Sequence, residues 1–371
     1  MGGVPSTRYE AISAIVLFLC TAILWGGGDK PAYKNILIVL VLLYLLLATG
    51  IALRGTNGGL KFGYARLIYI TVSLLFINNT FSYVSKLNFY IKILDLFILF
   101  ILTLNILSLT NAVNINSLIS RNYTQYLQYI TDYQLSINKP ILTFGVHNIA
   151  AFIYEGILLV SYYLYIRYRS KKYIAYISIL LILLMLLRCS TSIAYLLFNI
   201  IIIVYNQTKS VKRLAATIVL FALALFVAFQ FGLIDLYRDI LGQQANGWVS
   251  RYINGIQTIF STNIDALNKY PMGTGYCISA QENSLYGADS GFLVNFTIGS
   301  VVYTLFLYFT LFRKMLSSFN SRFIAYVAIA YLLIMELGFV TFLYYKSIAF
   351  IMVLFSLISC AENDTSDLND M

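Results

Sequence analysis

The sequence predicts an all-α, polytopic integral membrane protein, a single domain with about eleven or twelve transmembrane helices. Hydrophobic residues make up 60% of the 371-residue chain and charged residues only 11%, which leaves too little polar side-chain surface to cover a soluble globule. A membrane helix needs about 20 apolar residues. Apolar runs of about this length recur along the chain and are separated by short charged clusters, which is typical of a multi-pass protein.

Each predicted helix is an apolar run with polar residues on both sides. The first run, Ala11 to Trp25, is followed by a glycine-rich charged stretch and not by a small-residue cleavage site, so we interpret it as a span and not as a signal peptide. The predicted spans lie near 10–25, 34–53, 63–80, 88–110, 146–166, 173–187, 190–205, 214–234, 291–312, 323–343 and 346–360.

Two polar segments, 111–146 and 235–290, interrupt this pattern. Basic residues gather between and after them, at 167–172, at 209–213 and at 313–322. Lysine and arginine near membrane helices favour the cytoplasmic side, so we expect both polar segments to be periplasmic. The larger one, 235–290, is expected to contain short helices.

The first 110 residues leave the helix count and the orientation of the N-terminus open. Four spans before the 111–146 segment would place the N-terminus outside, whereas Arg54, Lys61 and Arg66 favour a cytoplasmic position for their loop. At the other end of the chain, the tail 361–371 is acidic and is expected to be disordered.

The region 173–205 is predicted to form a tight helical hairpin. Each half is short, and the turn between them holds Arg188 and the run Ser190, Thr191 and Ser192. The basic cluster before the hairpin places this turn on the periplasmic side.

Several classes of function do not fit the composition. The net charge of +10 would suggest nucleic-acid binding in a soluble protein, but here the basic residues cluster in short loops, as membrane orientation requires. The four cysteines and one histidine show no metal-ligand or disulfide spacing. No metal and no cofactor are predicted.

The last third of the chain carries a sequence of features in a fixed order. Ser250 and Arg251 precede an amphipathic stretch at 253–267, then comes the turn "KYPMGTG" at 269–275, and "ADSGFLVNFTIGS" opens the next span. This order resembles the O-antigen polymerase and O-antigen ligase superfamily. Upstream, "NKPILTFGVHNIAAFIYEG" at 138–156 resembles the segment that opens the span after the first outer loop of polymerase members.

The resemblance implies a glycosyltransferase of the bacterial inner membrane. It would transfer a growing glycan from a polyprenyl pyrophosphate carrier onto the sugar of a second lipid-linked repeat unit, at the periplasmic face, with a chain-length regulator as a possible partner. The ligase branch carries a histidine at the position of Asp289, which favours the polymerase branch here. An arginine followed eleven positions later by glycine, described for some polymerases, does not start at Arg121 or Arg251.

The pyrophosphate leaving group needs cationic donors, and arginine gives bidentate, permanently charged contacts to phosphate oxygens. Arg251 is the first candidate, with Tyr252 beside it in the substrate site. The alternative is that arginines on the outer side only extend to the lipid headgroups. The further outward candidates are Arg121, Arg188 and Arg238.

The incoming sugar hydroxyl must lose a proton as the glycosidic bond forms, and a positioned carboxylate or histidine can accept it. Asp289 is the best-placed base, although a carboxylate before a helix can also act only as a cap. Glu282 and His147 are the other candidates, and His147 could instead be an interfacial histidine without a catalytic role. Glu155 lies inside a predicted span, so we expect it to face the bundle interior and to pair with a cation.

Two other functions stay open at this stage. A ligase would transfer finished chains, and a flippase or transporter of lipid-linked oligosaccharide would move the repeat units instead of joining them. Transporters often contain internal repeats and broken helices with intramembrane charge, and no internal repeat is evident here.

Overall fold

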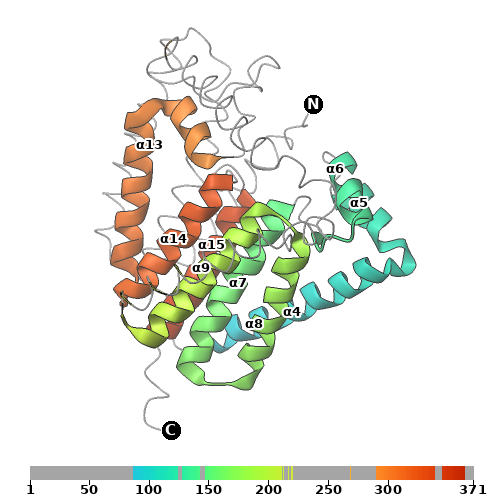
Figure 1. Ribbon diagram of the computed structural model, residues 1–371, viewed down its shortest axis with the longest axis horizontal. Coiled ribbons are helices and arrows are strands. Elements are labelled where there is room, and N and C mark those ends of the chain that lie inside the picture. The colour runs from blue at the N-terminus through green and yellow to red at the C-terminus, as the bar shows by residue number, and fades with distance from the viewer. Residues whose placement is uncertain are drawn as a thin grey trace.

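The computed structural model describes residues 87–123, 128–142, 147–210, 290–338 and 345–363, with a few isolated positions between 212 and 268. This part of the chain consists of helices and short connections, and it contains no strand. The all-α prediction is therefore confirmed for it (Figure 1). Its helices are α4 (Leu87–Thr110), the 3-10 turn η2 (Ala112–Asn114), α5 (Ile115–Tyr123), α6 (Gln128–Ser136), α7 (His147–Tyr168), α8 (Lys171–Leu187), α9 (Ser190–Thr208), α13 (Gly291–Ser318), α14 (Arg322–Gly338) and α15 (Tyr345–Asn363).

Several predicted features lie outside the described residues. They are the spans at 10–25, 34–53, 63–80 and 214–234, nearly all of the segment 235–290, and the chain after residue 363. The predicted disordered tail starts too early, because α15 continues to Asn363. Glu362 in its last turn accepts hydrogen bonds from the backbone N–H groups of Asn320 and Ser321, at 3.0 Å each, just before α14 begins.

Helix α7 is the centre of the bundle, and it contacts α8, α9, α14 and α15. Most of its length is buried, which fits a sequence that is apolar on all sides and not amphipathic. Gly156 allows the close approach of α15 and α14: a Cβ at this position would lie 2.5 Å from Leu354 Cδ1 and 2.7 Å from the Tyr331 hydroxyl. The absence of a side chain at Gly156 therefore sets how tightly the bundle packs around α7.

The described bundle has two chemically different ends. At one end α7 and α9 begin and α8 and α14 finish, and we call it the His147 end. At the opposite end α7 and α9 finish while α8 and α14 begin, and we call it the basic end. The short helices α5 and α6 lie at the His147 end (Figure 1), so the polar segment 111–146 is partly helical. The basic end carries Arg167, Arg169, Lys171, Lys172, Lys209 and Arg322.

The predicted hairpin at 173–205 is confirmed as the pair α8 and α9. Arg188 ends α8 in the left-handed conformation, with φ 48° and ψ 50°. Cys189 Sγ then caps α9 by accepting a hydrogen bond from Ser192 N–H, and the backbone N–H of Cys189 donates in turn to Ser192 Oγ. The left-handed residue and the cap reverse the chain within two residues.

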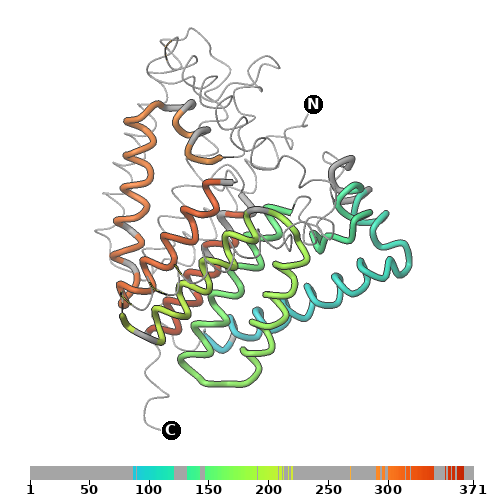
Figure 2. Tube along the Cα trace, in the orientation of Figure 1, coloured from blue at the N-terminus to red at the C-terminus, as the bar shows by residue number. Residues whose placement is uncertain are grey.

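The predicted single span 291–312 is wrong, because α13 is broken at Ser300. This residue has φ 65° and ψ −172°, outside the helical region. Asn295 Nδ2 donates to the Tyr308 hydroxyl at 3.0 Å, and the Phe292 and Tyr308 rings are 4.7 Å apart. In a straight helix residues 292 and 308 would be about 24 Å apart. The two arms therefore fold against one another as a hairpin (Figure 2).

Two described helices, Tyr90–Thr110 and His147–Tyr168, are long and apolar enough to cross a membrane. They differ in surroundings: α7 is mostly buried by protein, whereas α4 exposes a row of large apolar side chains. Leu96, Leu99, Phe100 and Ile106 belong to this row. Such a continuous apolar face suits contact with lipid.

Candidate functional site

The segment 137–142, which follows α6, is packed into the His147 end of the bundle. Lys139 is only 2% exposed, and Leu142 is fully buried. The backbone N–H of Lys139 donates to the Gln134 carbonyl at 3.0 Å. The Tyr154 hydroxyl, on the second turn of α7, donates to the carbonyl of Pro140. These contacts fix a polar stretch of backbone against the start of the central helix.

Gln134 fixes the position of His147. The backbone N–H of His147 donates to Gln134 Oε1 at 3.1 Å, and this identifies the amide oxygen because an N–H can only donate. The amide nitrogen therefore donates to His147 Nδ1, at 2.7 Å. The ring is then neutral with its proton on Nε2. In this arrangement His147 offers a hydrogen-bond donor to a ligand, and it must change tautomer before it can accept a proton through Nε2.

Lys139 and Arg188 bring two positive charges to the same end of the bundle. Lys139 Nζ donates to the Arg188 carbonyl at 3.3 Å. This carbonyl lies at the C-cap of α8, where the helix ends. No carboxylate forms an ion pair with Lys139 or Arg188 within the described residues. Burial lowers the pKa of Lys139 below its usual value of 10.5, the nearby Cys189 raises it, and the charge of Arg188 lowers it. An anion bound beside the two residues would favour the charged form.

The start of α9 completes this wall of the site. Thr191 Oγ1 donates to Asn148 Oδ1 at 3.3 Å, which joins the first turn of α9 to the first turn of α7. Helix N-termini carry partial positive charge, so both helices add to the positive potential around Lys139 and Arg188. The arrangement suits a ligand with several negative charges.

A second polar group lies where α13 begins, beside the last turns of α14. Ser290 Oγ donates to the Glu336 carbonyl at 3.2 Å, and the Glu336 carboxylate accepts a hydrogen bond from the Tyr308 hydroxyl. A Cβ at Gly291 would overlap the Glu336 carboxylate, so a larger residue here would displace that side chain. Asn295 donates in turn to Tyr308. These bonds fix the residues that directly follow Asp289 in the sequence.

The structure places two of the predicted site residues in one region, since His147 and Arg188 both lie around Lys139 at the His147 end. Arg121 belongs to α5 at this same end, and only its backbone is described. The remaining candidates lie outside the described residues: Asp289, Arg251, Glu282, Arg238 and Tyr252.

The expected interior position of Glu155 is confirmed, and its expected cationic partner is not found. Its side chain is fully buried, and Oε2 accepts a hydrogen bond from Asn199 Nδ2 at 2.8 Å. No lysine or arginine pairs with Glu155 in the part of the chain that the structure describes. An amide on α9 takes the place of the expected cation, which links α7 to α9 without a second buried charge.

Sequence reasoning missed Lys139 and Gln134. Lys139 is a lone lysine before a proline in a polar segment, which is typical of a solvent-exposed loop. One feature of the sequence indicates burial instead of exposure: the stretch directly after Pro140, "ILTF", is largely apolar. Gln134 carries no motif, and its role depends on contacts with α7 that only the fold creates.

Comparison of the chain with protein-family models, with curated proteins and with solved structures finds no match.

Proposed function

We propose that the chain is a polytopic polymerase of surface polysaccharide repeat units, of the O-antigen polymerase type, with the His147 end facing the periplasm. The observation that carries the proposal is the pair of cations Lys139 and Arg188, without a carboxylate partner in the described residues and opposite the basic end. A buried, unneutralised positive charge is costly to a fold. Its retention is explained if the natural occupant of the site is an anion.

The anion that fits is the pyrophosphate of a polyprenyl-linked donor. In the reaction the acceptor hydroxyl oxygen bonds to the anomeric carbon of the donor sugar, and the bond from that carbon to the pyrophosphate oxygen breaks. Negative charge then develops on the leaving polyprenyl pyrophosphate, which Lys139 and Arg188 stabilise together with Arg251. His147 Nε2–H can donate to the same oxygens, which suits a binding role better than the role of base.

The hydroxyl proton goes to Asp289 in this proposal. The support is indirect and comes from the next two residues of the chain, Ser290 and Gly291, which are fixed against Glu336. A base must be held in one position relative to the hydroxyl that it deprotonates, and a residue joined to this fixed helix start meets that need. Glu282 is the reserve candidate on the same segment.

A lipid-linked oligosaccharide transporter is the second candidate, and two observations favour it. Glu155 is a carboxylate buried inside the bundle, and α13 is broken at Ser300; both features occur in transporters. The three functions predict different surface glycans in a strain that lacks the gene. Loss of a polymerase leaves single repeat units on the cell surface, loss of a transporter leaves none, and loss of a ligase leaves full-length chains on the carrier.

A further inference from the structure

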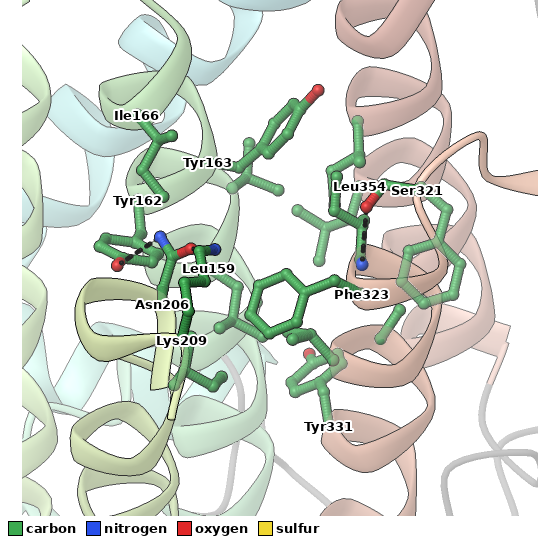
Figure 3. Close-up of a pocket in the computed structure, with 18 residues that line it drawn as sticks. Leu159, Tyr162, Tyr163, Ile166, Asn206, Lys209, Ser321, Phe323, Tyr331 and Leu354 are labelled. Carbon is green, nitrogen blue, oxygen red and sulfur yellow. Dashed lines mark hydrogen bonds between the residues drawn. The ribbon is translucent and has the colours of Figure 1, made fainter. Parts of the chain in front are cut away.

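A cavity of about 280 Å³ lies between α7, α9, α14 and α15 at the basic end (Figure 3). Its walls are apolar, which distinguishes it from the polar His147 end. Its volume is close to the lower limit of known ligand pockets, about 300 Å³. The apolar walls include Leu159, Val160, Ile202, Ile324, Val327 and Leu354.

The polar residues of the cavity include a connected set with a cation at its end. Lys209 Nζ donates to Asn206 Oδ1 at 2.6 Å, and Asn206 Nδ2 donates to the Tyr162 hydroxyl at 3.2 Å (Figure 3). Lys209 Nζ also lies 5.6 Å from the centre of the Phe323 ring. Lys209 is exposed and forms no ion pair within the described residues. The cavity is therefore largely apolar, with the cationic side chain of Lys209 at its edge.

Within the described residues, the two acidic groups near this end are already engaged. Glu362 accepts hydrogen bonds from two backbone N–H groups at the start of α14, and Asp95 pairs with Lys172 at 3.1 Å. Among the described residues, the surface around this end thus keeps an excess of positive charge, which Arg169, Lys171 and Arg322 increase. Neither carboxylate neutralises the amine of Lys209.

We propose that this cavity binds one acyl chain of an anionic phospholipid, with the lipid phosphate at Lys209 and the polar atoms of Asn206 beside it. Basic pockets between membrane helices on the cytoplasmic side bind anionic headgroups in this way. The apolar chamber accounts for the chain, and the lysine accounts for the preference for negative charge. The site rests on the membrane placement and is independent of the glycosyl-transfer chemistry, which uses the opposite end.

The test is lipid titration of the purified, delipidated full chain, followed by native mass spectrometry. We expect phosphatidylglycerol to bind more tightly than phosphatidylcholine with the same acyl chains, and inorganic phosphate not to compete. Lys209→Gln should weaken phosphatidylglycerol binding about fivefold, the contribution of one lysine near a membrane surface. Lys171→Gln is the matched control, an exposed lysine of the same end that does not line the cavity, and it should bind like the wild type.

A second readout locates the bound lipid on the wild-type protein. Phosphatidylglycerol with a diazirine in its acyl chain should label peptides of α7, α9, α14 and α15 that line the cavity. Ala328→Phe, which fills the chamber, should remove this label. Equal binding of both lipids, unchanged affinity in Lys209→Gln, competition by phosphate alone, or labelling confined to other helices would each overturn the proposal.

Discussion

The side chain of Lys139 is almost fully buried, with 2% of its surface exposed. Its amine donates a hydrogen bond to the Arg188 carbonyl. A buried charge without a partner lowers stability. The same residue can raise affinity for an anion, because in a desolvated site each charged hydrogen bond is stronger than in water. Stability and activity are therefore expected to respond in opposite directions when the charge is removed.

Lys139→Met should lower polymer formation roughly ten- to a hundredfold, the effect of losing one hydrogen bond to a charged group. The thermal unfolding temperature should stay the same or rise, because an uncompensated buried charge is replaced by an apolar chain of similar length. Both quantities are measured on the purified variant, with Lys171→Met as the exposed control. A less stable variant with full activity would make Lys139 a purely structural residue.

Asp289→Asn and Asp289→Ala separate catalysis from helix capping. Asparagine keeps the size and most of the capping ability of aspartate but cannot accept the proton. If Asp289 is the base, both variants lose at least a hundredfold in polymer synthesis while both fold normally. If only the alanine variant fails, Asp289 is a cap, and Glu282 and His147 become the candidates to test.

Single residues of the site could be predicted only where their chemistry is visible in the sequence. Arg188 was identified from its place in a predicted turn, and His147 because the sequence contains one histidine. The neutral state of His147 depends on which way the Gln134 amide faces, and the partner of Glu155 depends on how α9 packs on α7. Contacts of this kind join residues distant in sequence, and no local pattern encodes them.

Among the helices, hydropathy predicted α4, α7, α8, α9 and α15 to within three residues of their observed bounds. It also predicted the start of α14, and residues 339–343 of that predicted span lie outside the described residues. It failed at α13, since an apolar run is equally long whether the chain continues straight or folds back. At the reversal Ser300 has a positive φ of 65°, and the Asn295–Tyr308 bond is one of the contacts between the two arms. It also missed α5 and α6, which are polar helices without the apolar signal of a span.

The hairpin at Ser300 predicts a cross-link. With the four native cysteines replaced by alanine, Phe292→Cys with Tyr308→Cys should be joined by a short bifunctional thiol reagent, because the rings at these positions meet between the two arms. The matched control is Ile93→Cys with Leu109→Cys, which has the same spacing on the unbroken helix α4 and about 24 Å between backbones. Cross-linking is read by protease digestion at a site introduced between the pair. Equal behaviour of the two pairs would contradict the hairpin.

At the scale of the whole molecule, the charged residues of the described bundle form two groups, one at each end. Lys139 and Arg188 lie at the His147 end, and the longer basic clusters lie at the other, as the charge rule for membrane proteins requires if the His147 end is periplasmic. The site proposed for glycan transfer and the cavity proposed for lipid then face opposite sides of the membrane.

The proposed topology makes a direct prediction. In intact cells, Asn138→Cys should react with a membrane-impermeant maleimide added from outside, because residue 138 is exposed at the His147 end. Lys171→Cys and Arg313→Cys should react only after the cells are opened. The inverse pattern would place the proposed active site in the cytoplasm, where the carrier-linked glycan could not be extended at the periplasmic face.

Glycan transfer itself is tested most directly by incubating the purified protein with polyprenyl-pyrophosphate-linked repeat units from a strain that lacks the gene. The account predicts a ladder of carrier-linked polymers and release of free polyprenyl pyrophosphate for each bond formed. Both products should fall about ten- to a hundredfold in Lys139→Met and at least a hundredfold in Asp289→Asn. Repeat units that stay single in detergent, but cross the bilayer when the protein is reconstituted into vesicles, would contradict the polymerase and identify a transporter.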